Sequence, residues 1–178
     1  RLAVASADRA VRTIIESVSK AGLTDSTAIM IVGDHGFVDI HTSLRPNIWL
    51  RDNGFATPSQ TGSKDKWKAL FHTAGGSAFL HLKDKNDKAT VQQVRTILKN
   101  LPDAQKKMFR IVERPELDSI GADPNVPLAL AAREGFSFSA SDKGKTPVNA
   151  AKGGTHGYFP DFKNIQTGFI GYGAGFKK

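Results

Sequence analysis

The start of the chain alternates apolar and polar side chains at the spacing of a helix. The apolar positions are Val4, Ala7, Val11, Ile14, Ile15 and Val18. Gly22 follows them, and glycine commonly ends a helix because it adopts positive φ without strain. The pattern therefore predicts an amphipathic helix over approximately residues 4–21.

A second pattern follows after a short turn-like stretch. Residues 28–32 (Ala-Ile-Met-Ile-Val) are all apolar, which predicts a strand buried on both faces of a parallel sheet. The run ends at Gly33-Asp34-His35-Gly36. Polar side chains thus stand where the strand leaves the sheet, and open α/β folds bind ligands at that edge. We expect an α/β fold.

Shorter patterns predict the other elements, which we give by residue range. Extended segments or strands are expected at 45–50, 77–82, 108–112 and 169–172, and a helix at 88–99. Residues 127–132 and 136–138 are predicted to form a hairpin. Loops are expected at 52–66 and 139–154.

Composition narrows the class of protein. The chain has 178 residues, 39% of them hydrophobic and 24% charged, which suits one folded domain and argues against disorder. It has no cysteine, which excludes a disulfide framework, a thiolate zinc site and a thiol nucleophile. No apolar run approaches the ~18 residues that span a membrane.

The net charge is +8, from 25 Lys and Arg against 17 Asp and Glu. A positive field attracts polyanions and phosphorylated ligands. The lysines, however, lie in short scattered groups, several of them interrupted by acidic residues, with no basic stripe that contains aromatics. The pattern therefore does not favour a nucleic-acid-binding module. That module stays an alternative, and it predicts an affinity for DNA or RNA that falls steeply with salt.

Asp34 and His35 are the first candidates for chemistry. A carboxylate oxygen and an imidazole nitrogen both bind divalent transition metals, and zinc accepts that mixture. Gly33 and Gly36 flank the pair, and glycine lets a backbone turn and approach a ligand closely. A turn capped by the aspartate explains the tripeptide equally well, so both interpretations stay open.

His156 is the second candidate. It lies in the hexapeptide GGTHGY at 153–158, where little side-chain bulk surrounds it, so its imidazole is able to face a metal or a phosphate. For the hexapeptide alone, a flexible loop with an exposed histidine is the simpler interpretation. Thr155 is not a candidate nucleophile, because adjacent side chains seldom point at each other and no base accompanies it.

The remaining histidines have weaker patterns. His81 alternates with apolar neighbours, which predicts the outer face of a strand, and His72 has no partner pattern. His41 follows the Asp-His pair closely, and imidazole chemistry permits a ligand role there without requiring it. Aromatic residues in apolar surroundings are more often core than stacking platforms for a base. The aromatic residues concerned are Trp49, Phe55 and Trp67.

Together and in this order, the two motifs resemble the type I phosphodiesterase/nucleotide pyrophosphatase family of the alkaline phosphatase superfamily. The matching stretches are TAIMIVGDHGF at 27–37 and GGTHGYFPDFKNIQTGFIGYGAGF at 153–176. Bacterial members carry similar text at further places between them. These are RPNIWL at 45–50, Trp67, GGSAFLHL at 75–82, ERPELDSIG at 113–121 and GFSF at 135–138. The resemblance covers nearly the whole chain.

The resemblance implies an alkaline-phosphatase-like sheet with flanking helices, present as its C-terminal half. It implies one partial catalytic domain over 1–178, with a small α+β insertion at approximately 52–150. Members hold two divalent metal ions, usually zinc, beside a Thr or Ser nucleophile. By resemblance, Asp34 and His35 bind the metal that activates the nucleophile. His156 binds the other metal, which polarises the phosphoryl group and holds the attacking water.

The resemblance also implies the substrate and the place of action. We expect a phosphodiester or nucleotide-like substrate, cleaved at a phosphoester or pyrophosphate bond, and a periplasmic or extracellular location. The family's nucleophile lies far upstream of the Asp-His-Gly motif. The pairs Thr57-Pro58 and Thr146-Pro147 resemble its Thr-Pro only superficially, because both lie downstream of Asp34 and are interpreted as turns.

The chain thus supplies three of the six protein ligands that the family uses. We expect it to depend on a missing N-terminal half of the same enzyme and to have no turnover in isolation. The alternative is an independently folded binding or structural domain that keeps the family's fold without its chemistry.

Overall fold

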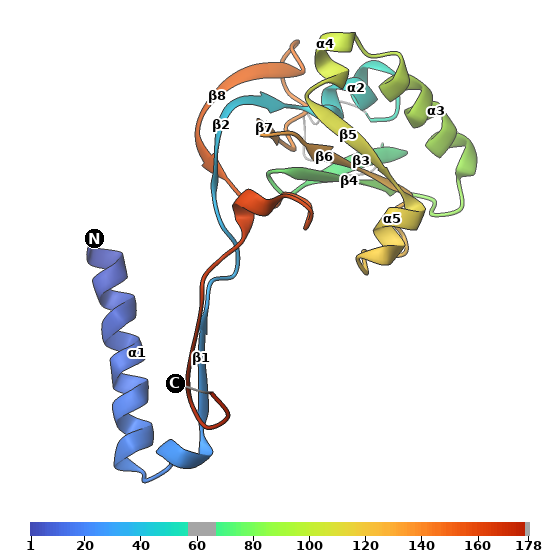
Figure 1. The fold of residues 1–178 in the computed structure, drawn as a ribbon. Helices are drawn as coiled ribbons and strands as arrows, with labels where there is room; N and C mark the ends of the chain where they lie inside the picture. The colour runs from blue at the N-terminus through green and yellow to red at the C-terminus, as the bar shows by residue number, and fades with distance from the viewer. Residues whose placement is uncertain (57–66, 177–178) are drawn as a thin grey trace. The chain divides into compact units, whose positions relative to one another are not determined.

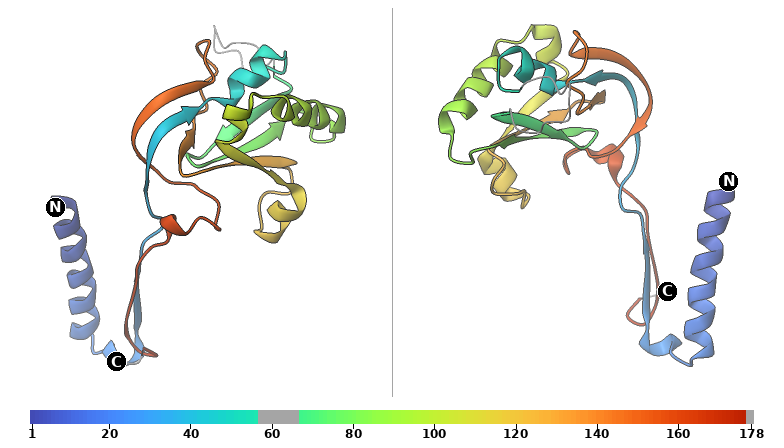
Figure 2. Two further views of the ribbon diagram at one scale, coloured as in Figure 1. Left: turned by 45° about the horizontal axis from the view of Figure 1, so that its top comes forward. Right: turned by 180° about the vertical axis from the view of Figure 1, so that it is seen from behind.

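The computed structural model describes residues 1–56 and 67–176, and its fold is mixed α/β. The chain divides into two compact units. Unit 1 is formed by Arg1–Asp34 and Thr167–Lys178, and unit 2 by His35–Gln166 (Figures 1 and 2). Among the described helices, none combines the length and the apolar character needed to cross a bilayer. The predicted insertion at approximately 52–150 stays a prediction.

Unit 1 begins with helix α1 (Leu2–Lys20), which confirms the predicted helix. The amide of Gly22 bonds the carbonyl of Ser19, and the amide of Leu23 bonds that of Val18. Gly22 has φ +71°, so this pair of bonds forms a Schellman motif, the left-handed helix end that glycine favours. A 3₁₀ turn, η1 (Thr24–Ser26), leads into strand β1 (Ala28–Val32).

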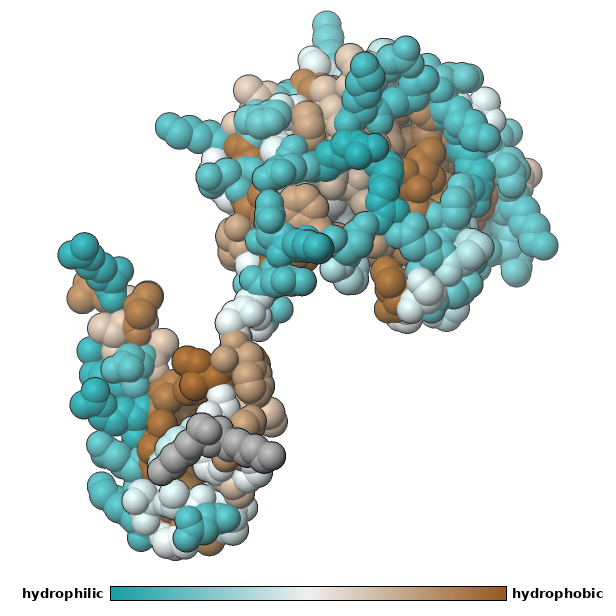
Figure 3. Space-filling view, viewed as in Figure 1, coloured by the Kyte–Doolittle hydropathy of each residue, from teal (hydrophilic) through white to brown (hydrophobic). Residues whose placement is uncertain are grey.

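β1 pairs with β9 (Phe169–Gly173), so both predicted strands are confirmed. The predicted parallel and doubly buried setting of β1 is wrong, because the pair is antiparallel and Met30 and Val32 are each 63% exposed. No residue is buried in the part of unit 1 that the structure describes. The apolar run is that of an interior strand, but among these residues it pairs with one strand only, and none of its side chains is fully buried. Figure 3 shows the resulting apolar surface of this unit.

Unit 2 contains a three-stranded sheet with β2 (Val38–Leu44) at its centre. β7 (Gly135–Phe138) runs parallel to β2, and β8 (Val148–Thr155) runs antiparallel to it. The loop predicted at 139–154 is wrong where β8 forms. The sequence of β8, VNAAKGGT, is rich in residues that strands disfavour, so its pairing with β2 rather than its own propensity makes it a strand.

The extended segment predicted at 45–50 is wrong. Pro46 opens helix α2 (Pro46–Asp52), where its fixed φ and missing N–H suit the first helical position. Ile48, Trp49 and Leu50 are all buried. A short helix buried on every side has no hydrophobic periodicity, so its sequence cannot be distinguished from that of a buried strand. The burial of Trp49 and Phe55 confirms that these aromatics belong to the core.

The second sheet of unit 2 has four antiparallel strands in the order β3–β4–β6–β5. Its strands are β3 (Ala69–Thr73), β4 (Ser77–Leu82), β5 (Phe109–Glu113) and β6 (Leu128–Ala132). The strands predicted at 77–82 and 108–112 are confirmed. The predicted hairpin is wrong, because β6 pairs with β4 and β5 on its two edges and all five of its residues are buried. β7 joins β2 instead.

Three helices and a 3₁₀ turn complete unit 2. They are α3 (Lys88–Lys99), α4 (Asp103–Lys106), α5 (Arg114–Ser119) and η2 (Lys163–Ile165). α3 has the predicted bounds, and its buried Val91, Val94 and Leu98 join the same core cluster as side chains of β3 and β4. Asp87 caps α3, because its carboxylate accepts from the amide of Thr90 at 2.9 Å.

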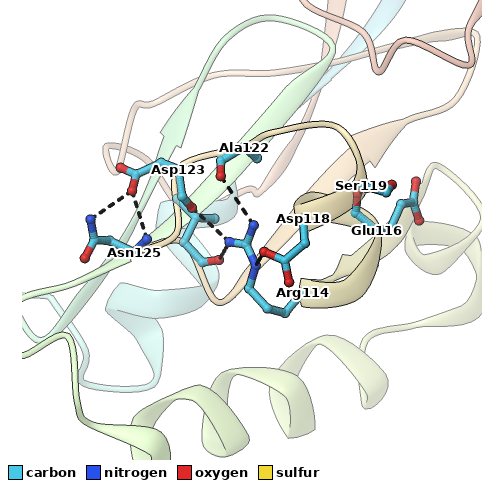
Figure 4. Close-up of polar contacts among 8 residues, drawn as sticks. Arg114, Glu116, Asp118, Ser119, Ala122, Asp123 and Asn125 are labelled. Atoms are coloured by element: carbon cyan, nitrogen blue, oxygen red, sulfur yellow. Dashed lines mark hydrogen bonds and ion pairs between the residues drawn. The ribbon is translucent and has the colours of Figure 1, made fainter.

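Arg114 clamps α5 to the loop that precedes β6. Its Nε donates to the Asp118 carboxylate at 2.9 Å, and its Nη1 donates to the carbonyls of Asp123, at 2.8 Å, and Val126 (Figure 4). Arginine suits this place because its planar fork reaches several acceptors at once. Arg114, which lies in the stretch ERPELDSIG, thus has a structural role.

Replacing Arg114 by Leu is expected to lower the free energy of unfolding of unit 2 by about 2–4 kcal/mol, because partly buried carbonyls lose their donor. Arg114→Lys is expected to lose most of the same stability, since one ammonium group cannot reproduce the fork. Urea unfolding measures both. Arg133→Leu, at an exposed arginine of the same unit, is the control, and a change as large as that of Arg114→Leu would contradict the clamp.

Asp87 makes the stability of unit 2 depend on pH. Hydrogen bonds from the Thr90 hydroxyl and amide lower the pKa of the Asp87 carboxyl below its ordinary value of 3.8. The stabilisation is therefore present above that value and is lost as the pH falls through the lower folded-state pKa. Asp87→Ala is expected to reduce the urea midpoint at neutral pH and to have a smaller effect in acid.

Asp87→Asn is the matched control, because asparagine caps a helix as well as aspartate does but does not titrate. We expect this variant to resemble the original chain at neutral pH. An effect of Asp87→Ala that is the same at neutral pH and in acid would contradict the assignment.

Candidate functional site

His35 and His156 face each other in unit 2. Their rings stack with centroids 4.1 Å apart and planes inclined by 19°. The register of β2 and β8 brings them together: Val38 lies opposite Thr155, so the residues just before β2 lie beside those just after β8. His35 is half-buried and His156 is exposed. Two of the three predicted ligands are therefore neighbours, although they stand 121 positions apart in the sequence.

Phe37 adds a third ring to the pair. Its centroid lies 5.4 Å from that of His35 and 5.3 Å from that of His156, and its side chain is 64% exposed. Its side chain also lies close to the backbone of Gly154, where a Cβ would be 3.4 Å from Cδ1 of Phe37, an ordinary van der Waals contact. The sequence analysis gave Phe37 no role. Its position directly after the Asp-His-Gly motif was the available signal.

The tautomer of His35 follows from its local contact. Nδ1 lies 3.1 Å from the carbonyl oxygen of Gly36. A carbonyl only accepts hydrogen bonds, so this contact is made by the tautomer that carries its proton on Nδ1. Histidines that bind metals have this arrangement, in which one ring nitrogen donates to a carbonyl and the other is the ligand atom.

Tyr158 anchors the chain just after His156. It is buried, stacks on Phe162 with centroids 4.6 Å apart, and donates from its hydroxyl to the carbonyl of Phe136 at 2.6 Å. Burial, followed by the nearby charge of Glu134, raises the pKa of the Tyr158 phenol. The hydroxyl therefore stays protonated and keeps this hydrogen bond throughout the physiological pH range.

Asp34, the third predicted ligand, belongs to unit 1, while His35 and His156 belong to unit 2. Close contacts with the chain itself account for the flanking glycines. In unit 1, a Cβ on Gly33 would lie 2.9 Å from Cβ of Thr167, and in unit 2 one on Gly36 would lie 2.9 Å from the backbone of Ile165. These glycines therefore accommodate neighbouring chain, and the close approach to a ligand stays a prediction.

The other predicted candidates lie as follows. His41 is exposed, contacts the hydroxyl of Thr42 through Nδ1 at 2.8 Å and packs edge-on against Phe136. Thr146 is exposed just before β8, and Asn149 donates to its carbonyl, as expected for a turn. Thr57-Pro58 lies outside the described residues.

His72 and His81 form a second imidazole pair on the four-stranded sheet. Their rings are edge-on with centroids 6.1 Å apart. Burial, together with nearby His72, lowers the pKa of His81, and the Asp123 carboxylate opposes this shift. The sequence analysis missed the pair because it depends on the antiparallel register, in which Leu70 lies opposite His81 and His72 lies opposite Phe79.

Within residues 1–56 and 67–176, no group of three or more His, Asp or Glu side chains is placed to hold a metal ion. The pair His35–His156 offers two nitrogen donors at a solvent-accessible position. Imidazole nitrogens suit zinc and the other late divalent transition metals, but each zinc site needs about four donors. Two imidazoles alone do not complete such a site.

Comparisons with known proteins identify a matching family for the sequence and solved structures with a similar fold. The family model described as type I phosphodiesterase/nucleotide pyrophosphatase matches residues 1–159. A comparison with curated proteins returned no match.

Solved structures share the fold. Human ectonucleotide pyrophosphatase/phosphodiesterase 5 superposes with a TM-score of 0.64 at 15% sequence identity, over 99% of this chain and 41% of that one. The murine protein gives a TM-score of 0.63 at 17% identity, over 97% and 41% of the two chains. An inactive variant of the murine protein in complex with AMP gives 0.61 at 17% identity, with the same coverage. The chain therefore spans about two fifths of the length of these relatives.

Proposed function

Because the chain belongs to the type I phosphodiesterase/nucleotide pyrophosphatase family, we propose that it is the C-terminal part of a metal-dependent hydrolase of phosphoester or pyrophosphate bonds. The observation that carries this proposal is the stacking of His35 on His156, 4.1 Å between ring centroids. These are the imidazoles of the two motifs by which the chain resembles the family. The substrate proposed is nucleotide-like, which agrees with the AMP bound by the murine relative.

The family resemblance of the two motifs supports a site for a pair of metal ions. In two-metal hydrolases the ions lie ~3.5–4 Å apart, and such a pair stabilises the attacking and leaving oxygens of an in-line displacement. The two imidazoles are neighbours, so each is available to a different ion of such a pair. We assign Asp34 and His35, which are neighbours in sequence, to the ion that activates the nucleophile, and His156 to the other. Zinc is the ion that this donor chemistry favours.

The protein's own contribution is to orient these donors. The bond from Nδ1 of His35 to the carbonyl of Gly36 holds the ring in the tautomer whose Nε2 is a ligand atom. The ring of Phe37 contacts both imidazoles and limits their rotation. An imidazole held in place binds a cation without losing further conformational freedom on binding, which favours metal affinity.

The donor set within this chain is incomplete. Asp34, His35 and His156 are three of the six ligands that the family resemblance implies, and the nucleophile it implies lies upstream. Since each ion needs about four donors, we propose that the chain alone holds neither ion firmly. The remaining ligands and the nucleophile would come from a preceding segment of the same enzyme.

Unit 1 offers a surface for that segment. β1 is apolar at every position and has β9 as its one paired neighbour among the described residues. The exposed fractions of Met30 and Val32 are each 63%, and those of Phe169 and Ile170 are 60% and 62%. An exposed strand edge with apolar faces favours pairing with a further strand. We propose that the preceding segment covers this surface.

The first prediction concerns the isolated chain. Residues 1–178 are expected to have no turnover of bis(p-nitrophenyl) phosphate at any zinc concentration, because half of the ligands and the nucleophile are missing. The measurement is release of p-nitrophenol by the pure chain. Zinc-dependent turnover that disappears in His156→Ala would contradict the proposed division of the active site.

The second prediction concerns a chain extended upstream of Arg1 by its natural sequence. We expect zinc-dependent hydrolysis that a chelator abolishes, and a fall in kcat/KM of at least about 100-fold in His35→Ala and in His156→Ala, because each removes an ion worth several kcal/mol. His72→Ala is the matched control and is expected to keep full activity. A folded, inactive protein that is indifferent to chelators would support the non-catalytic domain instead.

A further inference from the structure

The backbone that carries His156 packs tightly against the turn at residues 74–76, which joins β3 to β4. The amide of Gly76 donates to the carbonyl of His156 at 2.7 Å. Gly157 has φ +74°, and a Cβ there would lie 1.6 Å from the carbonyl oxygen of Ala74. No other residue fits at 157 unless one of the two backbones moves.

The turn contributes glycines to the same contact. A Cβ on Gly75 would lie 2.4 Å from the carbonyl oxygen of His156. One on Gly76 would lie 2.4 Å from Cγ of Tyr158. Both distances are shorter than Cβ atoms tolerate, so the absence of side chains on the two facing segments is what allows this approach. Gly75 faces the backbone of His156 and Gly76 faces the ring of Tyr158, so the contact holds the backbone of His156 closely.

The turn is itself fixed to both sheets of unit 2. The carbonyl of Gly75 accepts from the amide of Phe138 in β7 at 2.7 Å, and the carbonyl of Gly76 accepts from the amide of Ala132 in β6 at 2.8 Å. Because these strands belong to different sheets, the turn cannot shift without disturbing the ladders on either side. His156 thus takes its position from a rigid part of the unit.

We propose that the turn at 74–76 positions the imidazole of His156 against that of His35. An exposed histidine between glycines would otherwise sample many backbone conformations, and ordering it would cost free energy at every binding event. A backbone held by the turn removes that cost in advance. The inference rests on the proposed function only where it concerns the metal that His156 binds. The positioning of the ring is a property of the metal-free chain.

The experiment reads the contact between the two rings by NMR. Imidazole spectra of the isotope-labelled chain 1–178 contain five histidines, which single substitutions to Gln assign. Because the rings stack, His156→Gln is expected to shift the signals of His35 by removing the ring current of its neighbour. Gly157→Ala and Gly76→Ala are expected to move the His35 signals toward the positions they have in His156→Gln.

Gly121→Ala is the matched control. Gly121 has φ +70°, close to that of Gly157, but a Cβ there meets nothing within 4 Å, so this variant carries the backbone strain without the clash. We expect its His35 signals to stay unchanged. His72 and His81 are internal references on the strands that the turn joins, and a merely structural role for the glycines would move their signals as well.

Signals of His35 that stay at their original positions in both glycine variants would overturn the proposal. Equal movement of the His35, His72 and His81 signals would also overturn it. Should a glycine variant not fold, Tyr158→Leu takes its place, because it removes the ring that lies against Gly76. We expect it to move the His35 signals in the same way, and unchanged His35 signals would overturn the proposal. No metal is added, so failure here is distinct from failure of the zinc-dependent hydrolysis.

Discussion

The antiparallel pairing of β2 with β8 is the interaction on which the candidate site depends. It sets Val38 opposite Thr155, and this register places His35 and Phe37 beside His156. A slip of β8 by one residue would turn every one of its side chains to the other face of the sheet and separate the imidazoles. The side chains of β8 contribute little to its stability as a strand, so backbone hydrogen bonds maintain the geometry of the site.

Other contacts within unit 2 support that pairing. Gly75 bonds β7, and Gly76 bonds both β6 and the backbone of His156. Two residues after His156, Tyr158 bonds the carbonyl of Phe136 and stacks on Phe162. Glycine is needed on both sides because the two backbones approach too closely for a Cβ. Glycines, the least bulky residues of the chain, thus allow the close contacts that hold the backbone of His156.

The sequence predicts the elements that have a periodic pattern of their own. α1 and α3 have one apolar face each, and β4, β5 and β9 form short apolar runs, so all five lie where we expected them. α2 and β8 were not predicted, because α2 is buried on every side and β8 forms only through its partner. The antiparallel neighbour of β1 was also not predicted, since a doubly apolar strand indicates burial on both faces and not which strand lies beside it.

The candidate site was predicted in part for the same reason. Motif order and chemistry singled out His35 and His156, but the contribution of Phe37 and the support from Gly75 and Gly76 depend on contacts between segments distant in sequence. Glycines predicted to make room for a ligand make room for the chain itself at Gly33 and Gly36. Local sequence therefore indicates candidate groups, while tertiary packing decides which of them meet and how they are held.

The most direct measurement of the central claim is anomalous X-ray diffraction at the zinc edge from crystals of the upstream-extended protein grown with zinc. The account predicts two separate peaks, one within bonding distance of His35 and the other within bonding distance of His156. A single zinc bound by both imidazoles, or zinc bound only at other residues, would contradict it.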